Sequence, residues 1–497
     1  MEKGLKQAYG AFLETWNMLQ ASLTLFDWDT ETMAPEKGAE RTAKAVGSLS
    51  AAYQALFTGK ETERLLTLAD GAARLTETEK RIFQKIEKER KKLLAIPEEE
   101  YRRFSELLTT SVVKWSRAKR DNDFELFAPV LSEILETKKR FAAYQAEEGQ
   151  TPYDVLLMEY EEDFPSEKLD RFFDVLRESI VPLAKEIAEK GEKVPSAFLF
   201  QHFDLEKQKK FNRWIAAYLG FDFLRGVLSE SEHPFTTSLH KDDVRITTHY
   251  YENNLESAVF STIHETGHAL FEQGNSDEVT QTPLSGGTCG VHESQSRLYE
   301  NMLGRSFAFW KPIYGKLQEQ FPEQLSRIPE QEFIRAINRS EPSLIRTEAD
   351  ELTYCLHIMI RYELEKKLFD GSLSVEELPE AWKERYESYL GVSPKTASEG
   401  VLQDIHWAMG EFGYFPSYAL GNAMAAQLYH QMASEFDLEK ALEQGEIGKI
   451  TSWLRERIHV YGASRSMEEL LKELTGEKLD PCYYTEYLEK KYRSLYL

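Results

Sequence analysis

Two histidines four residues apart, His264 and His268, are the part of this sequence best suited to chemistry, and they enclose Glu265 in the pentapeptide H-E-T-G-H. On a helix, residues at i and i+4 project from the same face, so both imidazoles could bind one divalent ion, typically zinc at about 2.0–2.1 Å. The carboxylate of Glu265 could then take a proton from water bound to that ion. The pattern predicts a metal-dependent hydrolase of peptide bonds, with Glu265 as its general base.

The residues around the pentapeptide predict a long helix with a broad buried face. Asn253 and Glu256 fit a capping box at its start, and Gly274 is a typical stop. Apolar residues, among them Ile263 and Leu270, recur between these ends at helical spacing. Such a helix can line the floor of a cleft. The alternative is a pair of buried histidines that are merely satisfied by hydrogen bonds.

A catalytic zinc ion usually takes three protein ligands and leaves one position for water. The third ligand is expected in the segment 291–303, which follows a glycine-containing loop at 283–290. If this segment is helical, Glu293 and Glu300 lie on one face, two turns apart. Glu293 is nearer the end where the chain returns, so we expect it to be the ligand, with Glu300 behind the ligands or at the surface. His292 points elsewhere and could face the substrate.

Helical periodicity dominates the rest of the chain and predicts a mostly α fold. Apolar residues recur at three- and four-residue spacing among lysines and glutamates. The clearest predicted helices are 77–94, 127–145, 166–190, 205–218 and 376–389. No repeat or linker-like stretch interrupts the pattern. We therefore expect a single domain over 1–497, with an N-terminal helical part at roughly 1–200 over a catalytic part at roughly 201–497.

One segment, 244–250, is rich in β-branched and aromatic residues and predicts a strand just upstream of the metal-binding helix. A strand edge at this place could bind an extended peptide by backbone pairing. A small stabilising hairpin explains the pattern equally well.

The composition limits the classes of partner and compartment. Of the 497 residues, 41% are hydrophobic and 12% aromatic, which is enough for a large core. The net charge of −23 argues against nucleic acid and anionic membranes as main partners. Three widely spaced cysteines, an N-terminus without a signal-peptide pattern and the lack of an apolar run of about 18 residues predict a soluble, cytoplasmic protein.

Four further short motifs accompany the pentapeptide. They are D-V-R-I-T at 243–247, H-E-S-Q at 292–295, I-R-T-E-A-D at 345–350 and G-V-L-Q-D-I-H-W at 400–407. Together the five resemble the motifs of the helical zinc carboxypeptidases typified by thermostable bacterial and archaeal carboxypeptidases. The segment 28–35 also resembles this family, so the likeness spans most of the chain.

The resemblance implies a mostly α-helical, deeply clefted fold similar to that of neurolysin and angiotensin-converting enzyme, with a small β-element beside the active site and often a homodimeric assembly. It implies metal-dependent removal of single C-terminal residues with broad specificity, and poor action where proline blocks the bond. It also implies that Glu293 is the third ligand. One divalent ion per chain is expected, with zinc first and cobalt or manganese as alternatives.

A carboxypeptidase must recognise the free carboxylate of its substrate, and arginine suits this task because its guanidinium can bond both oxygens at once. Arg346 is the leading candidate and Arg245 the second. The nearby acids Glu348 and Asp350 could hold Arg346 in place, or could make it part of a purely structural ion pair. The resemblance favours the binding role.

The tetrahedral intermediate needs hydrogen-bond donors at the developing oxyanion, commonly a tyrosine hydroxyl or a histidine N–H. The tract 406–421 is rich in such groups. His406 and Tyr418 are our candidates, with Tyr414 in reserve.

Three other functions compete with this prediction. An oligoendopeptidase would use the same zinc chemistry but cut inside peptides, and a helical scaffold would use the histidines only structurally. A cysteine hydrolase using Cys289 and His292 lacks an ordering acid and a local signature, so we discount it.

Overall fold

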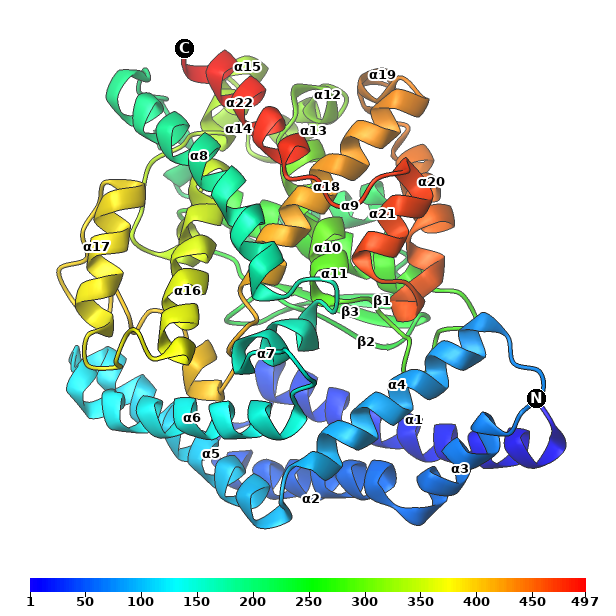
Figure 1. The fold of residues 1–497 in the computed structure, drawn as a ribbon. Helices are drawn as coiled ribbons and strands as arrows, with labels where there is room; N and C mark the ends of the chain where they lie inside the picture. The colour runs from blue at the N-terminus through cyan, green and yellow to red at the C-terminus, as the bar shows by residue number, and fades with distance from the viewer. The chain divides into compact units, whose positions relative to one another are not determined.

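The computed structural model describes residues 1–497, except for the side chain of Glu36, and confirms a mostly helical fold with a small sheet. Figure 1 shows the elements in chain order. The α-helices are α1 (Lys3–Thr32), α2 (Ala39–Thr58), α3 (Lys60–Asp70), α4 (Glu77–Ala95), α5 (Glu98–Asp121), α6 (Phe124–Gln145), α7 (Pro152–Tyr160), α8 (Ser166–Lys190), α9 (Leu205–Leu219), α10 (Leu255–Gly274), α11 (Cys289–Arg297), α12 (Phe307–Trp310), α13 (Tyr314–Gln320), α14 (Pro322–Leu325), α15 (Glu330–Ile337), α16 (Glu351–Asp370), α17 (Leu378–Leu390), α18 (Pro416–Glu435), α19 (Leu438–Glu443), α20 (Ile447–Arg457), α21 (Met467–Thr475) and α22 (Cys482–Tyr496).

The helices predicted from periodicity lie within two or three residues of the observed ones. The segment 166–190 coincides with α8, and the other predicted segments correspond to α4, α6, α9 and α17. Each of these helices buries the apolar stripe that marked it in the sequence.

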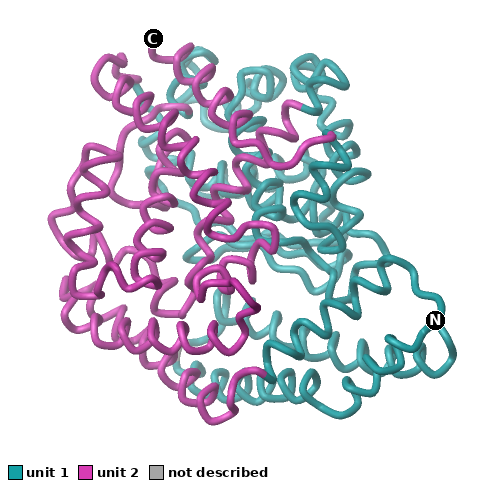
Figure 2. The backbone as a smooth tube through the Cα atoms, viewed as in Figure 1, with its two compact units in different colours: residues 1–94, 195–337, 431–475 teal, residues 95–194, 338–430, 476–497 magenta. Residues whose placement is uncertain are grey.

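The chain divides into two compact units, each built from three separate segments (Figure 2). The first unit contains 1–94, 195–337 and 431–475, and the second contains 95–194, 338–430 and 476–497.

The sheet belongs to the first unit and has the order β1-β3-β2. Its strands are β1 (Gly226–Glu230), β2 (Thr236–His240) and β3 (Asp243–Thr248). The predicted strand is therefore real, but it is the central one, because β1 pairs with it in parallel and β2 antiparallel. Both edges of β3 are occupied, so the expectation that this strand offers a docking edge was wrong. The unpaired strand edges of this sheet belong to β1 and β2, each of which pairs with β3 on one side.

The sheet packs on the helix that carries the pentapeptide, α10. Val244 and Ile246 of β3 are fully buried against Ala269 of α10 and Ala216 of α9. Alternation along a strand with one buried face explains why these two positions are apolar. The sheet and α10 thus lie side by side in the first unit, as Figure 1 shows.

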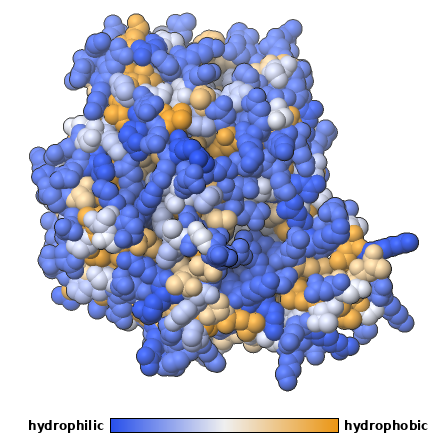
Figure 3. Space-filling model, viewed as in Figure 1, coloured by the Kyte–Doolittle hydropathy of each residue, from blue (hydrophilic) through white to orange (hydrophobic). Residues whose placement is uncertain are grey.

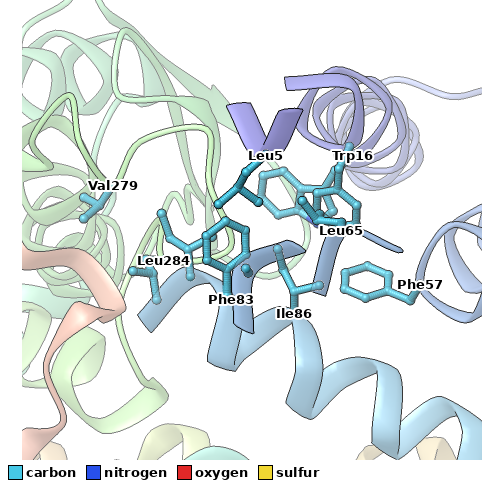
Figure 4. Close-up of a cluster of buried hydrophobic side chains, with 11 residues drawn as sticks. Leu5, Trp16, Phe57, Leu65, Phe83, Ile86, Val279 and Leu284 are labelled. Atoms are coloured by element: carbon cyan, nitrogen blue, oxygen red, sulfur yellow. The ribbon is translucent and has the colours of Figure 1, made fainter. Parts of the chain in front are cut away.

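The N-terminal helices of the first unit share a hydrophobic core with the loop that follows α10 (Figure 4). Trp16 of α1, Phe57 of α2 and Ile86 of α4 are buried there with Val279 and Leu284 of the loop. Burial of such side chains contributes about 1.5–3 kcal/mol each. The loop between α10 and α11 is therefore anchored by distant parts of the sequence.

In the second unit α16 is almost entirely buried. It contacts α8, α17, α6 and α7, and α8 in turn contacts α22. A helix that is buried all round is an interior helix of its unit.

The surface is predominantly polar on the face shown in Figure 3. Within the described residues, no helix combines the length and apolar character needed to cross a bilayer.

Candidate metal centre

The pentapeptide lies in the middle of α10, as predicted. The helix begins one residue later than the expected capping box, because Asn254 is the N-cap and its side chain accepts a 3.2 Å hydrogen bond from the Ser257 backbone N–H. Asn253 was therefore the wrong cap. An asparagine side-chain oxygen in this position satisfies one of the free N–H groups of the first turn.

The structure brings His264, His268 and Glu293 together, with one ligand atom of each within 4.8 Å of the others. Glu293 Oε2 lies 3.4 Å from His268 Nε2 and 3.8 Å from His264 Nε2. Tetrahedral ligands at about 2.0–2.1 Å from one ion are separated by about 3.3 Å, so these atoms fit a single divalent ion. The described residues include no other such cluster of three or more.

A glycine inside the pentapeptide allows Glu293, the candidate third ligand, to approach the two histidines. A Cβ on Gly267 would lie 2.7 Å from Ser296 Cα and 2.8 Å from the Gln295 carbonyl oxygen, both on α11. Any side chain here would push α11 away from α10. The close helix–helix contact that presents Glu293 to the two histidines therefore depends on Gly267.

Charges around Glu293 favour the ionised form that a metal ligand needs. Burial alone would raise the pKa of this carboxyl, but Arg297 and the histidines of α10 hold it well below its usual range. The Arg297 Nε donates a 2.7 Å hydrogen bond to Glu293 Oε1, which leaves Oε2 directed at the histidines.

Glu300 lies behind the first histidine. Its Oε2 is 2.8 Å from His264 Nδ1, which orients the ring so that Nε2 faces Glu293. Arg297 and Arg305 also bond this carboxylate. A carboxylate on the far nitrogen of a ligating histidine fixes its tautomer and raises its basicity.

We expect Glu293→Gln to weaken metal retention far more than Glu300→Gln. The first change removes a ligand, whereas loss of an outer carboxylate typically costs about 10- to 100-fold in metal affinity. The two affinities can be compared by titration against a chelator of known strength. If Glu300→Gln proved the weaker binder, the ligand would be Glu300.

Glu265, next to the candidate ligand His264 in the chain, is buried and is hydrogen-bonded to the edge strand of the sheet. The Thr236 hydroxyl of β2 donates a 2.6 Å hydrogen bond to Glu265 Oε2. Burial raises the pKa of Glu265 above its usual range, which makes it a stronger base. Thr236 could not be predicted from the sequence, because its partner Glu265 lies on another element.

A second chain of contacts runs behind His268. His292 Nδ1 bonds His268 Nδ1, and His292 Nε2 lies 2.8 Å from Glu272 Oε1. Burial, and then His292, lower the pKa of His268 to about 3, so its Nε2 lone pair is available to an ion. Sequence reasoning missed Glu272, although it continues the four-residue spacing of 264 and 268 along α10.

The contacts of His292 also argue against a cysteine hydrolase that uses Cys289 and His292. Both ring nitrogens of His292 are engaged by His268 and Glu272. His292 is therefore not placed to act as the base for Cys289.

A cavity of about 410 Å³ lies within the first unit, and its lining includes Thr236, which bonds Glu265, and Glu272, which bonds His292. Residues 236–239 of β2 and Glu272 form one wall. Trp16 of α1 and Lys85 of α4 lie in the opposite helical part. The volume is in the range of ordinary ligand sites, and the wall of β2 includes the Thr236 that bonds Glu265.

Arg245 lies on the central strand β3. Its guanidinium forms two hydrogen bonds with Asp243, of 2.8 and 2.9 Å, and lies 5.5 Å from the ring centroid of Trp28. This fork is thus already occupied by a carboxylate.

Arg346 belongs to the second unit, and its partners differ from those expected. Its Nε and Nη2 bond Asp404 at 3.0 and 2.9 Å, and its Nη1 bonds the Tyr354 hydroxyl. Asp350 instead caps α16 through Thr353, and Glu348 is exposed. The expectation that these two acids hold Arg346 was wrong, because the partner comes from the distant 400–407 motif.

His406 and Tyr418 lie near Arg346 in the second unit. The Arg346 guanidinium is 5.4 Å from the Tyr418 ring centroid and 5.7 Å from that of Phe415, and the His406 ring lies 4.6 Å from Phe415. Burial, and then Arg346, lower the pKa of His406 to about 4, so it is a neutral donor or acceptor near pH 7. Tyr414 packs between His406 and Tyr418.

Comparison with known proteins identifies one family of metallopeptidases. A model of the carboxypeptidase Taq (M32) metallopeptidase family matches residues 9–492. Carboxypeptidase 1 of Bacillus subtilis (strain 168) is 43% identical over 479 residues, which cover 96% of this chain and 95% of the relative. Thermostable carboxypeptidase 1 of Pyrococcus furiosus is 37% identical over 493 residues, 98% of each chain.

Solved structures agree with these sequence matches. The crystal structure of an M32 carboxypeptidase from Deinococcus radiodurans R1 is similar with a TM-score of 0.95 at 36% identity. The match covers 98% of this chain and 99% of that one.

Proposed function

The chain belongs to the carboxypeptidase Taq (M32) family of metallopeptidases and is a metal-dependent carboxypeptidase, and from this premise we propose how its residues carry out the reaction. The family membership confirms the resemblance found in the five motifs. It does not favour the oligoendopeptidase, and it replaces the scaffold hypothesis. We propose that the substrates are peptides with a free C-terminus, shortened by single residues with broad specificity.

The metal centre carries this proposal. We propose that His264, His268 and Glu293 hold one divalent ion, with Zn²⁺ first and Co²⁺ or Mn²⁺ as alternatives. When bound, such an ion supplies a Lewis acid that polarises the scissile carbonyl and lowers the pKa of the attacking water. Metal analysis of purified protein by inductively coupled plasma mass spectrometry identifies the ion.

Glu265 moves the protons. Its buried carboxylate takes a proton from the attacking water and passes it to the leaving amine. The hydrogen bond from Thr236 fixes Oε2 and leaves Oε1 to meet the water. The neutral His406 and the hydroxyl of Tyr418 are proposed to donate hydrogen bonds to the oxyanion, with Tyr414 in reserve.

We propose that the cavity along β2 accepts the part of the peptide that precedes the scissile bond. A carboxypeptidase needs room for a single residue beyond that bond, whereas the preceding chain is longer. The outer edge of β2 offers backbone groups to an extended chain, and 236–239 line the cavity.

Arg346 is proposed to bind the terminal carboxylate of the substrate, with Arg245 as the second candidate. Arg346 retains guanidinium N–H groups beyond the three bonds to Asp404 and Tyr354, because an arginine has five donors. Asp404 also fixes the plane of the guanidinium, which lowers the entropy lost on binding a carboxylate.

Amidation of the substrate's C-terminus should lower catalytic efficiency sharply if Arg346 binds the carboxylate. A charge-assisted hydrogen bond contributes about 1.5–3 kcal/mol, or one to two orders of magnitude in kcat/KM. Arg346→Ala should lose that much on free peptides and little on amidated ones, in a double-mutant cycle whose second change is made on the substrate. Mass spectrometry of the products, with and without chelator, measures both rates and the site of cleavage.

The matched control is Arg245→Ala on the same two peptides. Equal losses on both substrates for Arg346→Ala would assign Arg346 to structure, and a selective loss for Arg245→Ala would move the clamp to β3. Internal cleavage of the amidated peptide would support the oligoendopeptidase.

The assembly, the compartment, the partners and the domain organisation complete the proposal. We propose a homodimer in the cytoplasm, without nucleic-acid or membrane partners, and a chain that folds as a single domain over 1–497, with its N-terminal helical part at roughly 1–200. Light scattering after size-exclusion chromatography measures the assembly. A single cooperative unfolding transition is expected of one domain.

A further inference from the structure

Two fully buried residues of opposite charge occupy one face of α16, one turn apart. Arg361 and Glu365 are both 0% exposed. Arg361 bonds the start of the segment 403–413, and Glu365 bonds Trp407 in its middle and Gly413 at its end. Both side chains therefore bond the same irregular segment, which contains His406 and precedes α18.

Arg361 holds the N-terminal end of the segment. Its Nε donates a 2.7 Å hydrogen bond to Asp404 Oδ2, and its Nη2 donates a 2.8 Å bond to Gln403 Oε1. The same Gln403 oxygen accepts the Arg346 backbone N–H at 2.9 Å, and the other oxygen of Asp404 binds the Arg346 side chain. The position of Arg346 therefore depends on Arg361 through two shared acceptors.

Glu365 holds the C-terminal end. Its Oε1 accepts a 2.7 Å hydrogen bond from the Trp407 indole, and its Oε2 accepts the Gly413 backbone N–H at 2.8 Å. The Tyr153 hydroxyl of α7 donates a third bond to Oε2 at 2.9 Å. All three partners are donors, so the ionised carboxylate satisfies them together.

The segment leaves little room for an alternative path. Gly413 has a φ of +84°, and a Cβ there would lie 2.9–3.0 Å from the backbone of Leu156 and Leu157. Only glycine adopts this conformation without strain, and only glycine fits so near α7. The hydrogen bond to Glu365 therefore fixes a backbone position that sterics already confine.

Retaining both charges in the interior is costly. Burial raises the pKa of Glu365 to about 7, although the bonds from Trp407, Gly413 and Tyr153 act in the opposite direction. Replacing buried ionic groups with well-packed apolar ones is often neutral or stabilising. A contribution to stability therefore explains poorly why Arg361 and Glu365 are both buried here. Their role in fixing the position of the segment 403–413 explains it better.

We propose that Arg361 and Glu365 are positioning residues, by which α16 fixes both ends of the segment 403–413 and so sets the places of Arg346 and His406 for the substrate. This inference rests on the proposed function, and it adds residues that do not themselves touch the substrate. A displacement of about 1 Å in such a group can lower the rate about 100-fold.

The test compares Glu365→Gln with Tyr153→Phe. Glutamine has the same shape but one acceptor oxygen, so it cannot accept from both Trp407 and Gly413, and its NH₂ group opposes one of them. Phenylalanine at 153 removes one hydrogen bond from the same carboxylate and leaves both bonds to the segment. Trp407→Phe, which removes only the indole donor, serves if the glutamine variant fails to fold.

The first readout is the ratio of kcat/KM on a free peptide to that on its amidated form. Partial unfolding lowers both rates equally and leaves the ratio unchanged, whereas a displaced Arg346 lowers the ratio. We expect Glu365→Gln to reduce the ratio about tenfold or more, because it releases Trp407, three residues after the Asp404 that holds Arg346. Tyr153→Phe should leave it within about twofold, since the segment keeps both bonds.

The second readout is hydrogen exchange of the amides in 405–415. We expect faster exchange in Glu365→Gln than in Tyr153→Phe, with unchanged exchange in α10 and normal metal content. Where Arg346→Ala lowers the ratio, an unchanged ratio in Glu365→Gln overturns the inference, and unchanged exchange in this segment overturns it in every case. Measuring Arg346→Ala in parallel separates the two hypotheses. If that variant also keeps the ratio, the carboxylate clamp has failed, and the exchange result alone decides whether α16 holds the segment.

Discussion

Glu265→Gln is expected to keep the fold and the metal and to lose about 100- to 10,000-fold in turnover, the usual contribution of general acid–base catalysis. Glutamine has nearly the same size, and its side-chain oxygen can still accept the hydrogen bond from Thr236. It cannot accept a proton from the attacking water at neutral pH. Metal content, thermal unfolding and kcat on one free peptide measure the three parts of this expectation.

Thr236→Val is the matched control for that substitution. It removes the hydroxyl that fixes Glu265 Oε2 but leaves the carboxylate in place. Its loss should be much smaller than that of Glu265→Gln, because positioning is weakened while the base remains. A metal-replete Glu265→Gln protein with near-normal turnover would show that another group is the base.

The helices could be predicted because their signals are local. The stripe of apolar residues that marks 166–190 in the sequence is the same stripe that α8 buries. The spacing of His264 and His268 is equally local, since one helix turn brings the two rings together. A helix whose apolar periodicity lies within its own segment can be predicted without knowledge of the rest of the chain.

Other features were missed or misplaced because they depend on distant segments. The segment 244–250 was expected to offer a strand edge, but β2 is an edge strand and β3 is central. Strand order depends on which strands pair, and the β-propensity of one segment does not reveal it. The partner of Arg346 is Asp404, a residue 58 positions away, instead of the neighbouring acids. Thr236 bonds Glu265 across 29 positions of the chain, and Glu272, although it continues the spacing of 264 and 268, bonds His292 across 20 positions.

The proposed catalytic groups differ in how the structure supports them. Glu265 and the proposed ligand set His264, His268 and Glu293 lie within one unit, and the ligand atoms of the latter three lie within 4.8 Å of one another. Arg346, His406 and Tyr418 form a separate cluster in the second unit, organised by Asp404 and the rings around Phe415. Substitutions in the two clusters should therefore have different signatures, namely metal loss in the first and altered substrate discrimination in the second.

Protons and the metal ion should compete for the first histidine. Burial alone would lower the pKa of His264, but the carboxylates of Glu293 and Glu300 outweigh it and raise that pKa. A ligating imidazole must be neutral, so the protonated form excludes the ion. Metal affinity should consequently fall as the pH falls through the raised pKa of His264.

His268→Ala is expected to abolish both stoichiometric metal binding and activity, because two remaining ligands hold a divalent ion poorly. Its loss also leaves His292 and Glu272 without the ring they orient. His459→Gln is the control, since this buried histidine of the same unit bonds Gln295 of α11 and is not among the ligands. That variant should bind metal, so comparing the two separates the loss of a ligand from the loss of a buried imidazole. Metal content after dialysis and kcat/KM on a free peptide are the measurements. A His268→Ala protein with wild-type metal content and rate would refute the ligand set.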